Sequence, residues 1–233
     1  MTATHSTKRI LKQLPVGLII LLALFSGALF LFIFIIDEVL REKEELLDNN
    51  VFNFLSAHVI SPHLTSFMKG VTYFASANFL QVAYVVLILF HLFIKKYKTA
   101  IEVAVLGLSG FLVNYFMKLS FHRLRPPHPL IAPLDNFSFP SGHATSGFIF
   151  YGLLTYLVWK TNISRLLKYI TGTIFILFSL LIGFSRIYLR VHYPSDVAAG
   201  FCVGFAWLIL TIWLFERFER KPASSLKQKF KNG

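Results

Sequence analysis

Long apolar stretches separated by short charged connections dominate the chain, and they predict membrane-spanning helices. About 20 apolar residues cross the hydrocarbon core of a bilayer, and a charge at its centre costs several kcal/mol. Six stretches meet this requirement, and they cover residues 15–36, 78–94, 99–117, 144–159, 169–185 and 197–215. Only helices and closed barrels satisfy the backbone in lipid, and continuous apolar runs without two-residue alternation exclude the barrel. We therefore predict an all-α polytopic membrane protein with six transmembrane helices.

The segment between the first and second stretches is polar and partly amphipathic. Its apolar positions are Val39, Leu40, Leu46, Leu47, Phe52 and Leu55. A helix with one apolar and one charged face lies in the membrane interface. We therefore predict an interfacial extracytoplasmic helix between spans one and two.

The first stretch follows Lys8, Arg9 and Lys12, as the apolar part of a signal peptide would. However, it ends in Asp37-Glu38 without a small-residue cleavage site, and it is long enough to span the bilayer. We read it as a retained helix. The chain then divides into a cytoplasmic N-terminal segment (1–14), a six-helix membrane domain (15–216) and a basic cytoplasmic tail (217–233).

The amino-acid composition supports a membrane protein and argues against other classes of protein. Hydrophobic residues make up 55% of the 233 residues and charged residues only 15%, against about 25% charged in a soluble domain. The net charge of +12 would suit a polyanion, but so few charged residues argue against a soluble nucleic-acid binder, and we expect no nucleic-acid partner. The single cysteine, Cys202, excludes a disulfide framework and a paired-cysteine metal site.

The distribution of the basic residues predicts the orientation. With six spans, both termini share one side of the membrane, and that side carries 15 of the 23 Lys and Arg residues. The positive-inside rule therefore places both termini in the cytoplasm. From the compactness of the chain and the lack of a eukaryotic targeting signal, we expect a bacterial cytoplasmic membrane.

Two outer loops contradict this rule locally. The loop after the third stretch and the loop after the fifth are rich in cations and histidines, accompanied by Asp196, namely Lys118, His122, Arg123, Arg125, His128, His143, Arg186, Arg190, His192 and Asp196. One such cation could anchor a helix end to lipid headgroups. Several on one face favour a bound anion, since Arg and Lys suit phosphate oxygens.

The spacing within these loops forms three motifs. They are Lys118-x6-Arg125-Pro126, then Pro140-Ser141-Gly142-His143, then Ser185-Arg186-x5-His192-x3-Asp196. In content and order they resemble the signature of the type 2 phosphatidic acid phosphatase (PAP2) superfamily. The resemblance covers roughly residues 78–215. It implies a membrane phosphatase that uses no metal and no cofactor.

The resemblance also implies roles for the histidines. His192 is the nucleophile that forms a phosphohistidine, and His143 is the general acid for the leaving oxygen. Asp196 orients His192, and the two lie on one face if a helix begins near Tyr193. A carboxylate on one imidazole nitrogen leaves the other free to attack.

The remaining motif residues suit phosphate binding. Lys118, Arg125 and Arg186 would neutralise the oxygens of the transition state. Ser141 can cap a helix whose N-terminus attracts an anion, and Gly142 lets the backbone approach a phosphate oxygen. No metal is expected, because the two loops hold only two acids, Asp135 and Asp196.

The leading hypothesis is a phosphatase of lipid phosphates or diphosphates, with a slight preference for undecaprenyl diphosphate over phosphatidylglycerophosphate. Its partners would be the lipid substrate and membrane lipids, and no oligomeric state is indicated. A lipid phosphotransferase with the same site is an alternative, and a transporter or flippase is another, although transporters usually hold charges at the midplane. A haloperoxidase with vanadate in the site is disfavoured, since those members of the superfamily are soluble.

The additional residues His122, Arg123, His128 and Arg190 either bind a second phosphate or face solvent and headgroups.

Overall fold

The computed structural model describes residues 16–41 and 46–219, and every regular element in that part of the chain is helical. The elements are α2 (Val16–Ile36), the π-helical turn η1 (Asp37–Arg41), α3 (Leu46–His58), α4 (Pro62–Tyr73), α5 (Ala77–Phe93), α6 (Tyr97–Phe121), α7 (Gly142–Trp159), α8 (Arg165–Tyr188) and α9 (Pro194–Glu219). The all-α prediction is therefore confirmed for these residues. The predicted segment 1–14 lies outside the described residues, and so does all of the predicted tail after residue 219.

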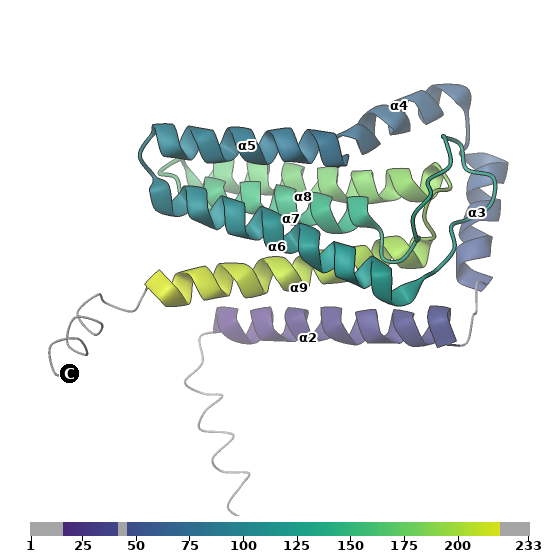
Figure 1. Cartoon of the computed structure of the whole chain (residues 1–233), viewed down its shortest axis with the longest axis horizontal. Coiled ribbons are helices and arrows are strands. Elements are labelled where there is room, and N and C mark those ends of the chain that lie inside the picture. The colour runs from purple at the N-terminus through teal and green to yellow at the C-terminus, as the bar shows by residue number, and fades with distance from the viewer. Residues whose placement is uncertain (1–15, 42–45, 220–233) are drawn as a thin grey trace, which may run out of the picture.

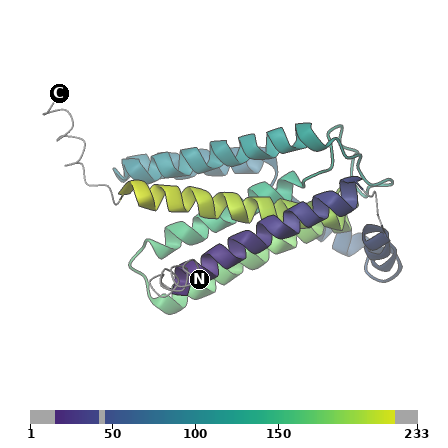
Figure 2. The ribbon, with the colours of Figure 1, turned by 90° about the horizontal axis from the view of Figure 1, so that it is seen from below.

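The long helices run alternately up and down a bundle (Figure 1). Helices α2, α6 and α8 run toward the end of the bundle that α3 crosses, whereas α5, α7 and α9 run away from it (Figure 1). Helix α7 is central, packed against α6, α8 and α9, and α2 lies along α9 (Figure 2). This order brings the α6–α7 and α8–α9 connections to the same end of the bundle, as the two cation-rich loops require.

Serine side chains define where several helices begin. Ser61, Ser76, Ser141 and Ser164 each occupy an N-cap position and accept a hydrogen bond from the backbone N–H three residues later. Such caps satisfy an N–H group that lacks a partner within the helix. The helix starts are thus encoded locally, including the start of α7 at the Pro-Ser-Gly-His motif.

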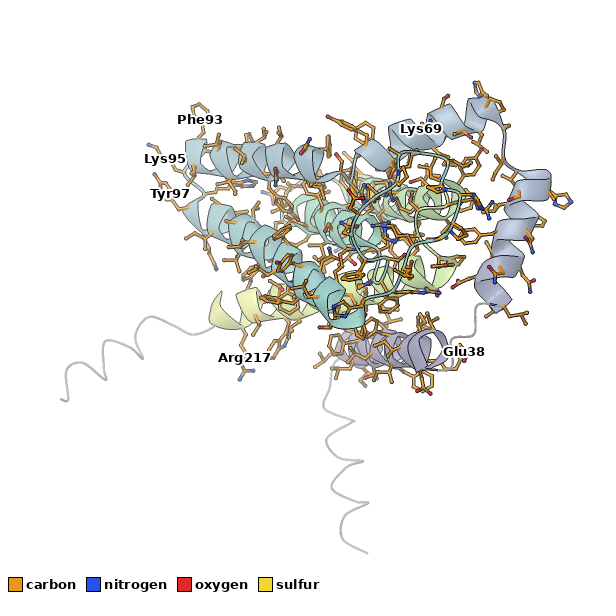
Figure 3. All side chains as sticks on the ribbon, turned by 45° about the vertical axis from the view of Figure 1, so that its right-hand side comes forward. Glu38, Lys69, Phe93, Lys95, Tyr97 and Arg217 are labelled. Carbon is orange, nitrogen blue, oxygen red and sulfur yellow. The ribbon has the colours of Figure 1, made fainter. Side chains whose placement is uncertain are left out.

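The outer surface of the bundle is apolar. Phe30 and Phe93, for example, are 72% and 86% exposed. Figure 3 shows the labelled charged side chains at the two ends, with Lys95 and Arg217 at one end and Glu38 and Lys69 at the other. Apolar sides between charged ends are expected of a multi-pass membrane protein.

Fewer helices qualify as membrane spans on length and hydropathy than the sequence predicts. Within residues 16–41 and 46–219, four qualify alone, namely Leu18–Val39, Tyr97–Phe121, Arg165–Tyr188 and Pro194–Arg217. A fifth is the pair α4 and α5, which are bent by 41° relative to each other. Helix α7 is not among them, because it opens with polar motif residues. Neighbouring helices enclose α7, so it needs less apolar surface.

The predicted interfacial segment forms two helices, α3 and α4, rather than one. Its apolar positions serve different contacts. Val39, Phe52 and Leu55 are buried in the protein, whereas Leu46 and Leu47 are 70% and 75% exposed. Helix α3 therefore uses part of its apolar face to pack on α8 and α9 at the end of the bundle where the motif loops meet.

Candidate active site

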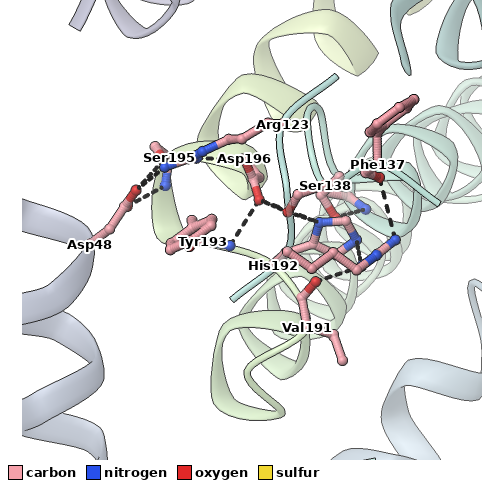
Figure 4. A network of polar contacts seen from close by, with 12 residues as sticks. Asp48, Arg123, Phe137, Ser138, Val191, His192, Tyr193, Ser195 and Asp196 are labelled. Atoms are coloured by element: carbon pink, nitrogen blue, oxygen red, sulfur yellow. Dashed lines mark hydrogen bonds and ion pairs between the residues drawn. The ribbon is translucent and has the colours of Figure 1, made fainter. Parts of the chain in front are cut away.

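His192 lies in the short connection between α8 and α9, and its side chain is only 2% exposed. Its Nδ1 atom is 3.4 Å from the hydroxyl of Ser138 and 3.5 Å from Oδ2 of Asp196 (Figure 4). Its Nε2 atom is 3.2 Å from Nη1 of Arg125. When the proton is on Nδ1, the N–H faces the carboxylate, and the Nε2 lone pair points toward a guanidinium that attracts anions.

Asp196 is the third residue of α9, and its carboxylate is completely buried. Oδ2 accepts the backbone N–H of Tyr193 at 2.9 Å and the hydroxyl of Ser138. The first of these bonds is half of a capping box and holds the beginning of α9 at Pro194. Oδ1 accepts Nη1 of Arg123 at 2.7 Å. The carboxylate therefore fixes the helix start and the imidazole at the same time.

Arg125 and Lys118 are held by backbone carbonyl groups of the α6–α7 and α8–α9 connections. Arg125 donates from Nε to the carbonyl of Asn136 at 2.8 Å and from Nη1 to that of Val191 at 2.5 Å. Lys118 donates to the carbonyl of Phe137 at 2.6 Å. Carbonyl acceptors orient these cations without neutralising them, so their charge remains available to an anion.

Arg186, in the last turn of α8, is 2% exposed. Its Nη1 donates to the hydroxyl of Thr72 on α4 at 2.7 Å. Its Nε atom is buried and has no hydrogen-bond partner among the described residues. A buried donor without a partner is costly in a folded protein, and a phosphate oxygen would satisfy it.

The beginning of α7 reaches the same place. The backbone N–H of Ser141 donates to the carbonyl of Asp196 at 3.0 Å, and the buried hydroxyl of Ser141 accepts from Ala144 at 3.4 Å. That hydroxyl therefore caps α7. A Cβ atom on Gly142 would lie 3.1 Å from the amide of Asn114 and 3.6 Å from Cε of Lys118.

His143 is half-buried and lies near the other charged motif residues. It interacts electrostatically with His192 and with all three motif cations, Lys118, Arg125 and Arg186. The structure thus brings every predicted site residue to one end of the bundle.

Burial shifts the pKa values of His192 and Arg125, which lie in the loops that connect the helices. It lowers the pKa of His192 to about 3, against the opposing hydrogen bond and charge of Asp196. His192 is therefore neutral at ordinary pH, which is the form an imidazole nucleophile requires. Burial also lowers the pKa of Arg125, and Asp196 opposes this effect.

Comparison with known proteins identifies the family. The sequence profile described as the PAP2 superfamily matches residues 98–220, which is more than half of the chain. The chain belongs to the PAP2 superfamily. It is 26% identical to phosphatidylglycerophosphatase B of Bacillus subtilis, over 83% of this chain and 94% of that protein. It is 31% identical to undecaprenyl-diphosphatase BcrC of Bacillus subtilis, over 71% of this chain and 81% of that protein.

Solved structures agree with this assignment. The transmembrane PAP2-type phosphatidylglycerolphosphate phosphatase of Bacillus subtilis superposes with a TM-score of 0.71 at 26% identity, over 86% of this chain and 98% of that chain. LpxE of Aquifex aeolicus superposes with a TM-score of 0.57 at 25% identity, over 72% of this chain and 95% of that chain. The predicted family is confirmed, and the protein is a PAP2 phosphatase with a multi-pass membrane fold.

Sequence reasoning missed two polar residues of this PAP2 site, Ser138 and Asp48, and left the role of Arg123 open. Ser138 bonds to Asp196, and its position two residues before the Pro-Ser-Gly-His motif was the only signal for it. Arg123 is only 8% exposed and bonds to Asp48 and Asp196, so of the two alternatives for it, the one in which it faces solvent or headgroups is wrong. Asp48 had no sequence signal, since it lies on α3, 75 residues before Arg123.

The other additional residues lie around the site. His122 ends α6 in a left-handed conformation with a φ of 43°, and His128 and Arg190 have φ values of 54° and 55°. His122 and His128 are exposed. The Arg190 guanidinium lies 5.3 Å from the centre of the Phe52 ring. All three residues lie in the α6–α7 and α8–α9 connections, which also carry motif residues.

Proposed function

We propose that the protein hydrolyses a lipid phosphate or diphosphate through a phosphohistidine on His192, at the outer face of the cytoplasmic membrane. The observation that carries the proposal is the position of His192. Its Nδ1 faces the buried carboxylate of Asp196, and its Nε2 faces Arg125. An imidazole held in this way can attack an anionic phosphorus, because the cations offset the repulsion that the phosphate would otherwise meet.

The reaction proceeds in two balanced steps. Nε2 of His192 forms a bond to phosphorus while the bond from phosphorus to the leaving oxygen breaks, and His143 gives that oxygen a proton. The oxygen of water then forms a bond to phosphorus while the bond from phosphorus to Nε2 of His192 breaks, His143 takes a proton from the water, and inorganic phosphate leaves. Lys118, Arg125 and Arg186 stabilise the charge that the phosphoryl oxygens carry in both steps. With these cations in place, the proposed reaction needs no metal ion.

For the topology, we propose six spans, in which α5 and α7 are the two that do not qualify by themselves on length and hydropathy. The alternating directions of the long helices support this count (Figure 1). In this arrangement residues 1–14 and 217–233 are cytoplasmic, and residues 15–216 form the membrane domain. Helices α3 and α4 lie on the outer side, at the membrane interface.

For the substrate, the matched relatives support a lipid that carries a phosphate or a diphosphate. Two of them are named for phosphatidylglycerophosphate and undecaprenyl diphosphate. We favour undecaprenyl diphosphate, because the same two connections carry the additional groups Arg190, His122 and His128, which are suited to a second phosphate. The lipid tail would remain in the bilayer and reach the site laterally between helices.

A phosphate-release assay in detergent tests the proposed reaction. Purified protein should release inorganic phosphate from undecaprenyl diphosphate or phosphatidylglycerophosphate with EDTA present. His192→Ala should abolish release, whereas His63→Ala, a change at an exposed residue of α4, should not. Loss of activity in EDTA, or an active His192→Ala variant, would contradict the mechanism. Transfer of the phosphoryl group to an acceptor other than water would instead reveal a phosphotransferase.

A labelling experiment tests the topology. Cys202, the single cysteine, is buried and can be changed to Ser to give a background without cysteine. In that background, Asp135→Cys in the α6–α7 connection should react with a membrane-impermeant thiol reagent in intact cells. Lys96→Cys, at the opposite end of the bundle, should react only after the cells are opened. The reverse pattern would show that the site faces the cytoplasm.

A further inference from the structure

Arg123 lies between two buried carboxylates that come from different helices. Its Nη1 atom is 2.7 Å from Oδ1 of Asp196, and its Nη2 atom is 2.9 Å from Oδ2 of Asp48 (Figure 4). The side chains of Asp48 and Asp196 are 4% and 0% exposed. A buried cation shared by two carboxylates is costly to disrupt, because removing one partner leaves an unpaired buried charge.

Asp48 also holds the beginning of α9. Its Oδ1 accepts the backbone N–H of Ser195 at 3.0 Å, and its Oδ2 accepts the hydroxyl of Ser195 at 2.6 Å. Ser195 is the second residue of α9 and directly precedes Asp196. A carboxylate at a helix N-terminus satisfies a free N–H and interacts favourably with the helix dipole. Here that carboxylate comes from α3, far away along the chain.

Aromatic rings cover this ion network. The guanidinium of Arg123 lies 3.9 Å from the centre of the Tyr193 ring, and Phe52 of α3 packs on the same ring with 5.7 Å between centres. Burial would by itself lower the pKa of Arg123, but Asp196 and Asp48 raise it above the ordinary value. Arg123 therefore stays charged in an environment that largely excludes water.

The network determines which way the Asp196 carboxylate faces. Arg123 occupies Oδ1, so Oδ2 is the oxygen directed at Nδ1 of His192. Asp48 in turn holds Arg123 and the backbone next to Asp196. A chain of contacts thus runs from α3 to the proposed nucleophile without reaching the phosphate itself.

We propose that Asp48 and Arg123 are positioning residues, which act through Asp196 to hold His192 in its reactive orientation. Helix α3 then completes the active site, although it lies outside residues 98–220, which match the PAP2 profile. This inference rests on the proposed function, since it assigns Asp48 and Arg123 to the reaction of His192.

Turnover measurements on Asp48→Asn test the inference. The amide keeps the shape of the side chain but removes its charge, so kcat should fall about tenfold while KM changes less than about twofold. Vanadate imitates the phosphoryl group, so the number of vanadate-binding sites counts the folded active sites. The kcat is expressed per vanadate-binding site, so a loss of folded protein alone does not lower it. The matched control is Asp135→Asn, at an exposed acid of the α6–α7 connection, which should keep the wild-type kcat.

A double-mutant cycle tests the connection between the two residues. Arg123→Met leaves two buried carboxylates without their cation and should lower kcat about 100-fold. Adding Asp48→Asn removes one of these charges and should restore kcat severalfold above that of Arg123→Met alone. Arg123→Lys, which keeps the charge, should retain more activity than Arg123→Met. A merely structural role predicts instead that kcat per binding site stays at the wild-type value in the single and double variants.

The outcomes are distinct. A wild-type kcat for Asp48→Asn, a change in KM alone, or additive losses in the double variant would overturn the inference. If Arg123→Met does not fold, the kcat of Asp48→Asn per binding site still decides. If the wild-type protein releases no phosphate from any lipid phosphate, the proposed function fails, whereas an active wild type with an unaffected Asp48→Asn variant refutes only this inference.

Discussion

The Oδ2 atom of Asp196 lies 3.5 Å from Nδ1 of His192, four residues earlier in the chain. The carboxylate is also bonded to the backbone at the beginning of α9, so it cannot turn away from the imidazole without disturbing the helix start. The orientation of His192 is thus tied to a structural feature of the bundle.

Asp196→Asn should lower kcat about 100-fold to 10,000-fold, because an amide can stabilise the wrong tautomer of the imidazole and does not offset its positive charge. Phosphate release from the lipid panel measures the effect. The thermal unfolding temperature and the number of vanadate-binding sites serve as controls for folding. A loss of less than tenfold in a folded variant would show that Asp196 does not orient His192.

The pH dependence of kcat/KM should lack an acid limb due to His192 between pH 7 and pH 5. Its pKa in the folded protein is lowered to about 3, so it remains unprotonated over this range. For an imidazole with an ordinary pKa, the neutral fraction would fall about 30-fold by pH 5. The measurement compares kcat/KM across pH after correction for ionisation of the substrate phosphate. A corrected limb near pH 6.5 that follows His192 would contradict the prediction.

Arg186→Lys should lower kcat/KM about 100-fold, or ~3 kcal/mol of transition-state stabilisation. Lysine offers one compact charge and cannot both bond to Thr72 and direct a second donor at the phosphate. Inhibition by vanadate should weaken in parallel, since vanadate imitates the phosphoryl group in the transition state. Arg165→Lys, at the exposed start of α8, is the control. Unchanged vanadate inhibition in Arg186→Lys would exclude Arg186 from the phosphate site.

Gly200→Ala should lower both the unfolding temperature and the activity. A Cβ atom at this position would lie 2.8 Å from the backbone oxygen of Ser141 and 2.9 Å from Cβ of Ala144. Helix α9 would have to move away from the beginning of α7, which carries His143, at a cost of about 1–3 kcal/mol. The control is Gly70→Ala on α4, where nothing lies within 4 Å of the added atom. Wild-type stability in Gly200→Ala would show that this close approach does not matter.

Each of the six apolar stretches contains most of one helix, and every one of these helices except α2 extends beyond its stretch. The fifth stretch, 169–185, lies within α8 (Arg165–Tyr188), and the third, 99–117, lies within α6 (Tyr97–Phe121). Hydropathy marks the part of a helix that must be apolar. The helix itself continues until its backbone hydrogen bonds end at a capping residue. At α7 such a residue, the Ser141 cap, was visible in the sequence.

Short-range relationships were predictable for the same reason. The spacing of His192 and Asp196 places them together once α9 begins at Pro194, and Pro-Ser-Gly-His marks a helix start. The motif loops meet at one end because the helices alternate in direction. The first two features depend on hydrogen bonds and side-chain spacing within a few residues. The third depends on the number of times the chain crosses the bundle.

The sequence by itself therefore determined the helical class, the family and the set of motif residues, because apolar runs and motif spacing are local properties. Only the tertiary structure decided that Arg123 serves two carboxylates rather than a second phosphate, and that Asp48 is one of them. A buried charge must be paired, but which partner it finds depends on how distant helices pack. Helix α3 folds over the beginning of α9, and that packing selects the pair across 75 residues of chain.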